Sequence, residues 1–268
     1  MLLKIVKRPE PARAMVYVTP ILALALTVLT GMSLFTFLGV DPVEALQNFF
    51  ILPINDQYGL TELFVKATPL ILCAIGLSVG FRANVWNIGA EGQLTIGAIF
   101  GGGLFVYFHD VDSILLLPAM VLMGAVGGAL WAAIPAYLKT RFNANEILTS
   151  LMLVYVATLL LSLLVHGPFR DPDGYNFPES RIFSDSATMP ILLEGTRLHF
   201  GTIIAFLAVI TTWIMLAKTL VGFQIKVIGA APKAGAYAGF SQKKIVWFSL
   251  LFGGAMAGLA GVSEVAGP

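Results

Sequence analysis

The chain alternates between long apolar runs and short polar segments. Runs that approach or exceed the roughly 18–20 residues a helix needs to cross a bilayer occur seven times: Ala14–Gly39, Leu63–Gly80, Ile88–Phe108, Ile114–Leu138, Ile147–His166, Phe200–Ala217 and Ile245–Val262. They are too long for barrel strands, and a span in lipid must satisfy its own backbone hydrogen bonds. The pattern predicts an all-α fold, a polytopic transmembrane helical bundle of about seven spans forming a single domain over residues 1–268.

Composition agrees with that pattern, since 57% of the residues are hydrophobic, 12% are charged and the mean hydropathy is +0.86. A soluble globular domain does not have this composition. The first apolar run is too long for a signal peptide and is interpreted as an uncleaved anchor. A protein of the cell (inner) membrane, surrounded by lipid, is therefore expected.

The positions of Lys and Arg predict the orientation. If the N-terminus is cytoplasmic, most of the 16 basic residues fall on the inner side of the alternating spans, as the positive-inside rule requires. Residues 167–199 then form an external loop and residues 218–244 a cytoplasmic loop. The net charge of +1 hides this asymmetry, which reports membrane insertion and gives no support for a nucleic-acid partner.

Three spans carry glycines four residues apart. This spacing places two glycines on one helix face and lets helix backbones approach closely. Helix packing is accordingly expected at the pairs Gly97 and Gly101, Gly124 and Gly128, and Gly254 and Gly258.

The polar stretch FRANVWNIGAEGQ, residues 81–93, lies between two apolar runs. A carboxylate and carboxamides at membrane depth must face protein or water. Two interpretations stay open on the residues alone. Phe81–Asn87 is a cytoplasmic turn with Glu91 in the first turn of the next helix, where the helix dipole favours an acid, or the stretch enters the bilayer unwound and lines a translocation path.

No catalytic, metal or cofactor site is predicted. The chain has no phosphate-binding loop, no H-E-x-x-H and no Cys/His cluster with zinc spacing. GLSVG matches the nucleophile-elbow pattern, but Ser78 falls inside an apolar run and not between a strand and a helix. Any energy for uphill transport must come from another chain or an ion gradient.

The expected cytoplasmic loop groups small residues around Pro232, a residue that suits the first turn of a short helix. It also carries Val227, Ile228, Tyr237 and Phe240, apolar residues that need a surface to cover them. An ordinary solvated connection is the alternative interpretation.

Four segments carry a family resemblance: FRANVWNIGAEGQLTIGA, LKTRFNANEILTSLMLVYVA, KVIGAAPKAGAYAGFSQKK and GGAMAGLAGVSEVAGP. In this order they resemble permease subunits of ABC importers in the branched-chain amino acid and simple-sugar superfamily, nearest the nucleoside branch that works with a basic-membrane-protein type binding protein. The resemblance implies ATP-driven nucleoside import by alternating access, with simple sugars such as ribose as the second substrate class. Apart from the resemblance, an ion-coupled secondary transporter stays open as an alternative. Relatives continue beyond EVAGP, so further C-terminal spans are expected to be missing.

The resemblance also implies partners and site residues. The partners are a second permease subunit, two cytoplasmic ATPase subunits, an external solute-binding protein and a small-molecule solute. Substrate-pathway roles fall on Asn84, Asn87, Glu91 and Gln93, which favours the second interpretation of the polar stretch. ATPase coupling falls on Gly229, Ala230, Pro232, Ala234, Tyr237 and Gly239.

Overall fold

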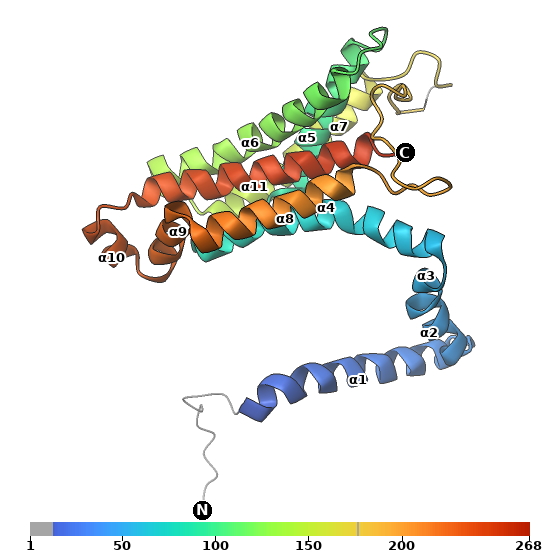
Figure 1. The fold of residues 1–268 in the computed structure, drawn as a ribbon, viewed down its shortest axis with the longest axis horizontal. Coiled ribbons are helices and arrows are strands. Elements are labelled where there is room, and N and C mark those ends of the chain that lie inside the picture. The colour runs from blue at the N-terminus through green and yellow to red at the C-terminus, as the bar shows by residue number, and fades with distance from the viewer. Residues whose placement is uncertain (1–12, 176) are drawn as a thin grey trace, which may run out of the picture. The chain divides into compact units, whose positions relative to one another are not determined.

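The computed structural model describes residues 13–175 and 177–268, which form helices and connecting loops (Figure 1). The basic residues expected at the cytoplasmic N-terminus, Lys4, Lys7 and Arg8, lie outside the described residues. Within the described part no strand forms, and a single isolated bridge joins Ile191 to His199. The chain divides into two compact units, residues 1–60 and 61–268, and each is described by itself.

The first unit contains α1 (Arg13–Phe37), α2 (Pro42–Phe50) and α3 (Leu52–Asn55). Four hydroxyl groups of α1, on Thr27, Thr30, Ser33 and Thr36, donate to the carbonyl four residues earlier. These bonds satisfy polar groups inside an otherwise apolar helix, as a lipid environment demands. The Asp41 side chain caps α2 by accepting from two backbone N–H groups at its start.

The second unit is built from the remaining helices, the first of which begins at the end of unit one. They are α4 (Gln57–Arg82), α5 (Ala90–Tyr107), α6 (Leu116–Phe142), α7 (Glu146–His166), α8 (Gly201–Lys218), α9 (Leu220–Ala230), α10 (Pro232–Tyr237) and α11 (Gln242–Val265).

Six helices in the described chain are long and apolar enough to cross a membrane: α1, α4, α6, α7, α8 and α11. The all-α, polytopic expectation is confirmed, and the chain is a multi-pass membrane protein. The run at residues 88–108 forms α5 as a helix but is not among the six. Its start contains Glu91 and Gln93 and its middle three consecutive glycines, which lower its apolar character relative to the other spans.

Helix α11 organises the second unit. It packs along both α5 and α6 (Figure 1), and Val262 joins Phe105 and Met120 in one buried apolar cluster. A second cluster, around Val79, Ile225 and Leu250, fastens α4 and α9 to α11. These contacts fix the positions of the segments that flank the helices.

The two long loops lie at opposite ends of this unit (Figure 1). Residues 167–199 adjoin the C-terminal end of α11, where Met189 N donates to Ala266 O at 2.7 Å. Helices α9 and α10 lie at the other end, next to the start of α11. The segments predicted to be external and cytoplasmic are thus separated by the length of the helices.

Candidate functional site

The polar stretch forms a non-helical connection between α4 and α5. Val85 N donates to Gly80 O at 2.9 Å, which closes the end of α4, and Asn84 adopts a left-handed conformation with φ 55°. Asparagine tolerates this region better than most residues. Residues 83–89 lie outside any helix, Arg82 ends α4, and Glu91 lies in the first turn of α5.

Two carboxamides from this stretch form a reciprocal pair. Asn87 Nδ2 donates to Gln93 Oε1 at 2.9 Å, and Gln93 Nε2 donates to Asn87 Oδ1 at 3.2 Å. Asn87 Oδ1 also accepts from Gly89 N at 3.0 Å. Both side chains are buried, so these bonds replace water and hold the connection against the start of α5.

The connection is also attached to α7. Ser150 Oγ accepts from Ile88 N at 3.1 Å, and a Cβ on Gly89 would lie 2.8 Å from Ser150 O. Glycine is therefore required there by a close backbone approach. Ser150 was not predicted, because a serine within an apolar run gives no local sign of a partner 62 positions away.

The four residues predicted to line the pathway separate into two groups. Asn87 and Gln93 are buried and bond to each other, whereas Asn84 and Glu91 are exposed. Trp86 Nε1 donates to Asn84 Oδ1 at 3.3 Å. The Glu91 side chain has no hydrogen bond or ion pair to any described residue, so its carboxylate is available to solvent, solute or another chain.

The glycines predicted to pack form one seam among α5, α6 and α11, which we call the glycine seam: Gly97, Gly101, Gly124, Gly128, Gly254 and Gly258. A Cβ on Gly97 would lie 2.3 Å from Gly258 Cα, and one on Gly258 would lie 2.1 Å from Gly124 O. A Cβ on Gly128 would lie 2.2 Å from Gly254 O. Backbone meets backbone at Gly97, Gly128 and Gly258, whereas the Val262 side chain fills the space beside Gly101 and Gly124.

The segment predicted to couple to an ATPase forms the end of α9, a break and α10. On its inner side, a Cβ on Gly229 would lie 2.0 Å from Arg82 O, and one on Gly235 would lie 2.6 Å from Ile228 Cδ1. Phe240 N donates to Gly235 O at 2.9 Å. These contacts fasten the segment to the end of α4 and to its own α9.

The outer side of this segment is exposed and consists mainly of small residues. We call it the coupling face: Ala230, Pro232, Ala234, Ala236, Tyr237 and Gly239. Tyr237 is 97% exposed, and Pro232 opens α10 at its first turn. Gly239, with φ 81°, has nothing within 4 Å of a Cβ built on it. The φ of Gly239 favours glycine at that position, whereas Ala230, Ala234 and Ala236 are exposed, so packing within the described chain does not explain their small size.

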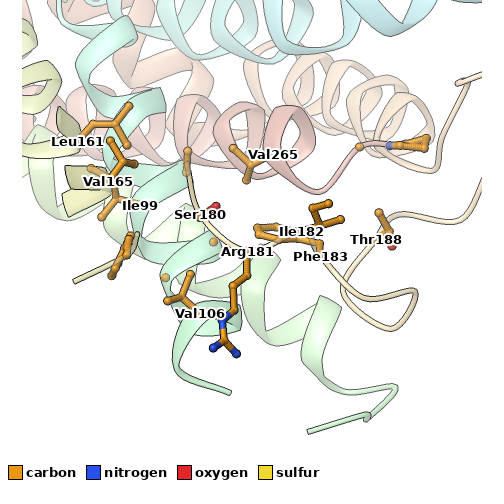
Figure 2. Close-up of a pocket in the computed structure, with 16 residues that line it drawn as sticks. Ile99, Val106, Leu161, Val165, Ser180, Arg181, Ile182, Phe183, Thr188 and Val265 are labelled. Carbon is orange, nitrogen blue, oxygen red and sulfur yellow. The ribbon is translucent and has the colours of Figure 1, made fainter. Parts of the chain in front are cut away.

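A cavity of about 530 Å³ lies at the opposite end of the unit, between α5, α7 and residues 180–188 (Figure 2). Its walls are chiefly apolar, with Ile99, Leu161 and Val165 on one side and Ile182 and Phe183 on the other (Figure 2). None of the four predicted pathway residues lines it. With so few polar groups, it does not provide the convergent hydrogen-bonding groups that orient a polar solute.

The serine of the elbow-like pattern has a structural bond. Ser78 Oγ donates to Ile75 O at 2.7 Å within α4, so it does not sit at a strand-to-helix turn. Among the described residues no group of three or more His, Cys, Asp or Glu side chains could hold a metal ion.

The structure also reveals polar links between distant segments. Arg197 makes a two-point contact with Glu62 at the start of α4, with Arg197 Nε donating to Glu62 Oε1 at 2.9 Å. Lys139 on α6 forms an ion pair with the buried Glu146 on α7 at 2.5 Å. Arg197 and Glu62 lie 135 positions apart, and Lys139 and Glu146 lie on different helices, so neither pair was predicted.

Comparison with known proteins assigns the family. The model of the branched-chain amino acid transport system / permease component family matches residues 59–268. The chain belongs to this family. The matched residues include the polar connection, the glycine seam and the coupling face.

Curated relatives agree with this assignment. The chain is similar to a glucose ABC transporter permease of Haloferax volcanii, at 40% identity over 97% of this chain and 70% of the relative. It is similar to a nucleoside ABC transporter permease of Lactococcus lactis, at 30% identity over 91% and 69%. A guanosine ABC transporter permease of Bacillus subtilis is 29% identical over 91% and 70%. No solved structure matches the chain. The expected membership in the ABC permease superfamily is confirmed.

Proposed function

We propose that this chain is the membrane permease subunit of an ATP-driven importer, in which its helices form the solute path by alternating access. ATP hydrolysis takes place on partner chains, and this chain performs no covalent chemistry. The observation that carries the proposal is the coupling face, an exposed surface of small residues held rigidly at one end of the helical unit.

The coupling face has the properties of a docking surface. Its inner side is fixed through Gly229 and Gly235, so a push on α10 is transmitted to the end of α4. Its outer side lets another backbone approach closely, and Tyr237 supplies an aromatic side chain of the kind that dominates interface energetics. We assign this face to a cytoplasmic ATPase subunit, two of which serve a pair of permeases.

The orientation follows from the same assignment. Arg82, Lys218 and Lys243 lie at the ends of α4 and α8 and the start of α11, beside the coupling face. That end is cytoplasmic in the proposal, as is the N-terminus, and residues 167–199 face an external solute-binding protein.

We assign the path-lining role to Glu91 and, with it, Asn84. Asn87 and Gln93 support the same connection from behind, because their polar groups are already used by each other. An exposed carboxylate without a partner at the start of a membrane helix is costly to keep next to lipid, so it faces water, solute or the second permease.

The solute we propose contains a sugar ring. Nucleosides are the class expected from the sequence motifs, and two relatives near 30% identity carry nucleoside or guanosine names. Free sugars are the second candidate, favoured by the relative with a glucose name at 40% identity. Nucleosides and free sugars share the polyhydroxylated ring and differ in the base.

Uptake in cells with and without the gene tests this function. Labelled uridine, guanosine, ribose and glucose are supplied before and after ATP depletion, with the ion gradient maintained. Gene-dependent uptake that stops on ATP depletion supports the importer. Competition by uridine but not glucose assigns nucleosides, and the reverse assigns sugars. Uptake that survives ATP depletion and stops when the gradient collapses contradicts the proposal and supports ion-coupled transport.

A further inference from the structure

A basic cavity lies between the end of α6 and the start of α11. It has a volume of about 220 Å³, and all but one of its lining residues carry polar or charged side chains: Lys139, Thr140, Arg141, Asn143, Gln242, Lys243 and Val246. Lys139 is neutralised by Glu146. Arg141 and Lys243 are exposed and form no ion pair with any described residue, so the cavity keeps two uncompensated positive charges.

An apolar groove runs alongside α6 one turn further into the membrane. It has a volume of about 290 Å³ between α6 and α7, and Thr149 is its one polar lining residue. Ile134 and Leu138 line the groove, and Arg141 follows them at the i+3 position of the same helix face. Toward the C-terminal end of α6, the apolar groove is thus followed by the positive charge of Arg141.

Aromatic side chains place this helix end at the membrane surface. Tyr137 and Phe142 are 51% and 65% exposed and pack edge to face with ring centroids 6.0 Å apart. Trp247 Nε1 donates to Thr140 Oγ1 at 3.0 Å. Tyr and Trp gather at the level of the lipid headgroups, where one end of the ring is wet and the other apolar.

We propose that the basic cavity binds the headgroup phosphate of an anionic phospholipid, whose acyl chain lies in the groove between α6 and α7. Arg141 and Lys243 contact the phosphate, while Asn143 and Gln242 supply amide donors beside it. Cation pockets between helices on the cytoplasmic side of a membrane are suited to anionic headgroups. A lipid bound there would hold α6 against α11 next to the coupling face. The choice of the cytoplasmic leaflet rests on the proposed orientation of the chain, whereas the choice of a lipid does not.

Charge complementarity and the apolar groove on the same helix favour lipid over an acidic side chain of a partner protein. A carboxylate would use the cations but leave the groove between Ile134 and Met152 unexplained. A lipid occupies both, since its charged and apolar parts are covalently joined in the same order.

Lipid retention by the full chain, purified with its partners and studied by native mass spectrometry, tests the site. Phosphatidylglycerol is compared with phosphatidylcholine for the unmodified protein, for Arg141→Gln/Lys243→Gln, and for the matched control Lys226→Gln/Lys244→Gln. The control removes the same charge from lysines that do not line the cavity. We expect the unmodified protein and control to prefer phosphatidylglycerol, and the first variant to lose about 30-fold in affinity for it.

Any of four results would overturn the site. One is an unchanged preference in Arg141→Gln/Lys243→Gln. Another is equal loss in both double variants, which means that only the general surface charge matters. The third is displacement of phosphatidylglycerol by inorganic phosphate at equal concentration, which identifies an ion site without a lipid. Loss of ATPase subunits with lipid binding unchanged assigns the cavity to a protein partner instead. Arg141→Lys/Lys243→Arg keeps both charges and separates binding from misfolding, since it should retain the lipid.

Discussion

Small residues gather in two regions of the second unit, and the structure uses them in opposite ways. In the glycine seam they let α5, α6 and α11 touch backbone to backbone, with Gly258 at the centre. On the coupling face, Ala230 and Ala234 are exposed, so packing within the described chain does not explain their small size. The contrast teaches that residue size alone does not distinguish packing from docking. Small residues that pack closely against another part of the chain serve the fold. We assign exposed small residues without such a contact to docking with a partner.

The polar connection repeats this contrast within one short stretch. Asn87 and Gln93 satisfy each other in the interior, while Glu91 is exposed without a partner among the described residues. Substitution of the polar residues that bond within the chain is expected to lower stability. Substitution of the exposed Glu91 carboxylate is expected to change transport.

Breaking the glycine seam should have the largest effect. Gly97→Ala places a methyl group against Gly258 Cα, so α5 and α11 must separate, and we expect a loss of about 3 kcal/mol or more in the free energy of unfolding. Gly102→Ala on the same helix is the control, because its methyl group would meet only side-chain atoms, the Phe183 ring at 3.3 Å and Val265 Cγ2 at 3.8 Å. Thermal unfolding in detergent measures both. Equal melting temperatures for the two variants would contradict the close backbone packing of α5 against α11 at the glycine seam.

Blocking the coupling face should abolish uptake and leave folding intact. Ala234→Arg puts a long charged side chain on an exposed position, so we expect uptake to fall to the level of cells without the gene, together with loss of ATPase subunits on affinity purification. Pro178→Arg in the loop at the opposite end is the matched control and should retain the ATPase. Normal ATPase retention by Ala234→Arg would remove the main support for the proposed function.

Deleting one member of the amide pair should cost stability without a large change in shape. Asn87→Ala leaves the buried Gln93 amide unsatisfied, for which about 1–3 kcal/mol is expected. The double variant with Gln93→Ala should cost less than the sum of the single changes, because the pair is already broken by the first. Asn48→Ala, at an exposed position of α2, should change the free energy of unfolding by about 0.5 kcal/mol or less. Strict additivity would show that the pair is not coupled.

Exposure of Glu91 predicts its chemical accessibility. In a Cys73→Ala background, which removes the one native cysteine, Glu91→Cys should react with a small water-soluble thiol reagent in at least one conformational state. Gln93→Cys is the buried control and should react more slowly in every state. Complete protection of position 91, with and without ATP, would assign it to a contact with protein or lipid and not to the path.

The smallest effect concerns pH at the predicted external end. Burial lowers the pKa of His199 below its usual value, and His199 Nδ1 accepts from Gly201 N at 3.2 Å at the start of α8. The nearby Glu264 acts in the opposite direction. Protonation removes this acceptor and places a positive charge at a helix N-terminus, which is unfavourable.

The sign of the pH effect follows from that lowered pKa. The unfolded chain takes up a proton near pH 6.5, before the folded chain does. The contribution to stability is therefore complete above about pH 6.5 and declines as the pH falls toward the folded pKa, by at most about 1.4 kcal/mol per pH unit. His199→Gln should flatten this decline in melting temperature between pH 7.5 and 5.5, and His166→Gln should not. A decline unchanged in His199→Gln would exclude His199 as its source.

Much of the fold follows from local patterns in the sequence. The seven apolar runs mark where α1, α4, α5, α6, α7, α8 and α11 form, because burial in lipid imposes both length and composition on a span. The range predicted for α11, Ile245–Val262, is shorter than the helix in the structure, Gln242–Val265. Ser241 caps a polar first turn that hydropathy does not detect. Helices α2 and α3 were missed because they are short.

The site was less accessible to sequence reasoning. Spacing alone pointed to glycine packing, but which helices meet depends on the fold, as the contact of Gly97 with Gly258 shows. The reciprocal bonds of Asn87 and Gln93 and the link from Ile88 to Ser150 depend on distances between segments, and no local pattern encodes them. The assignments to the path and to the ATPase remain predictions.

Photo-crosslinking from Tyr237 tests the central claim most directly. Tyr237 is replaced by a photoreactive phenylalanine analogue in the assembled transporter, and Phe177 in the predicted external loop is replaced in the same way for comparison. The account predicts a covalent adduct between position 237 and the ATPase subunit, and none from position 177. Adducts to the ATPase from position 177, or only to lipid from position 237, would contradict the docking of this face on the ATPase.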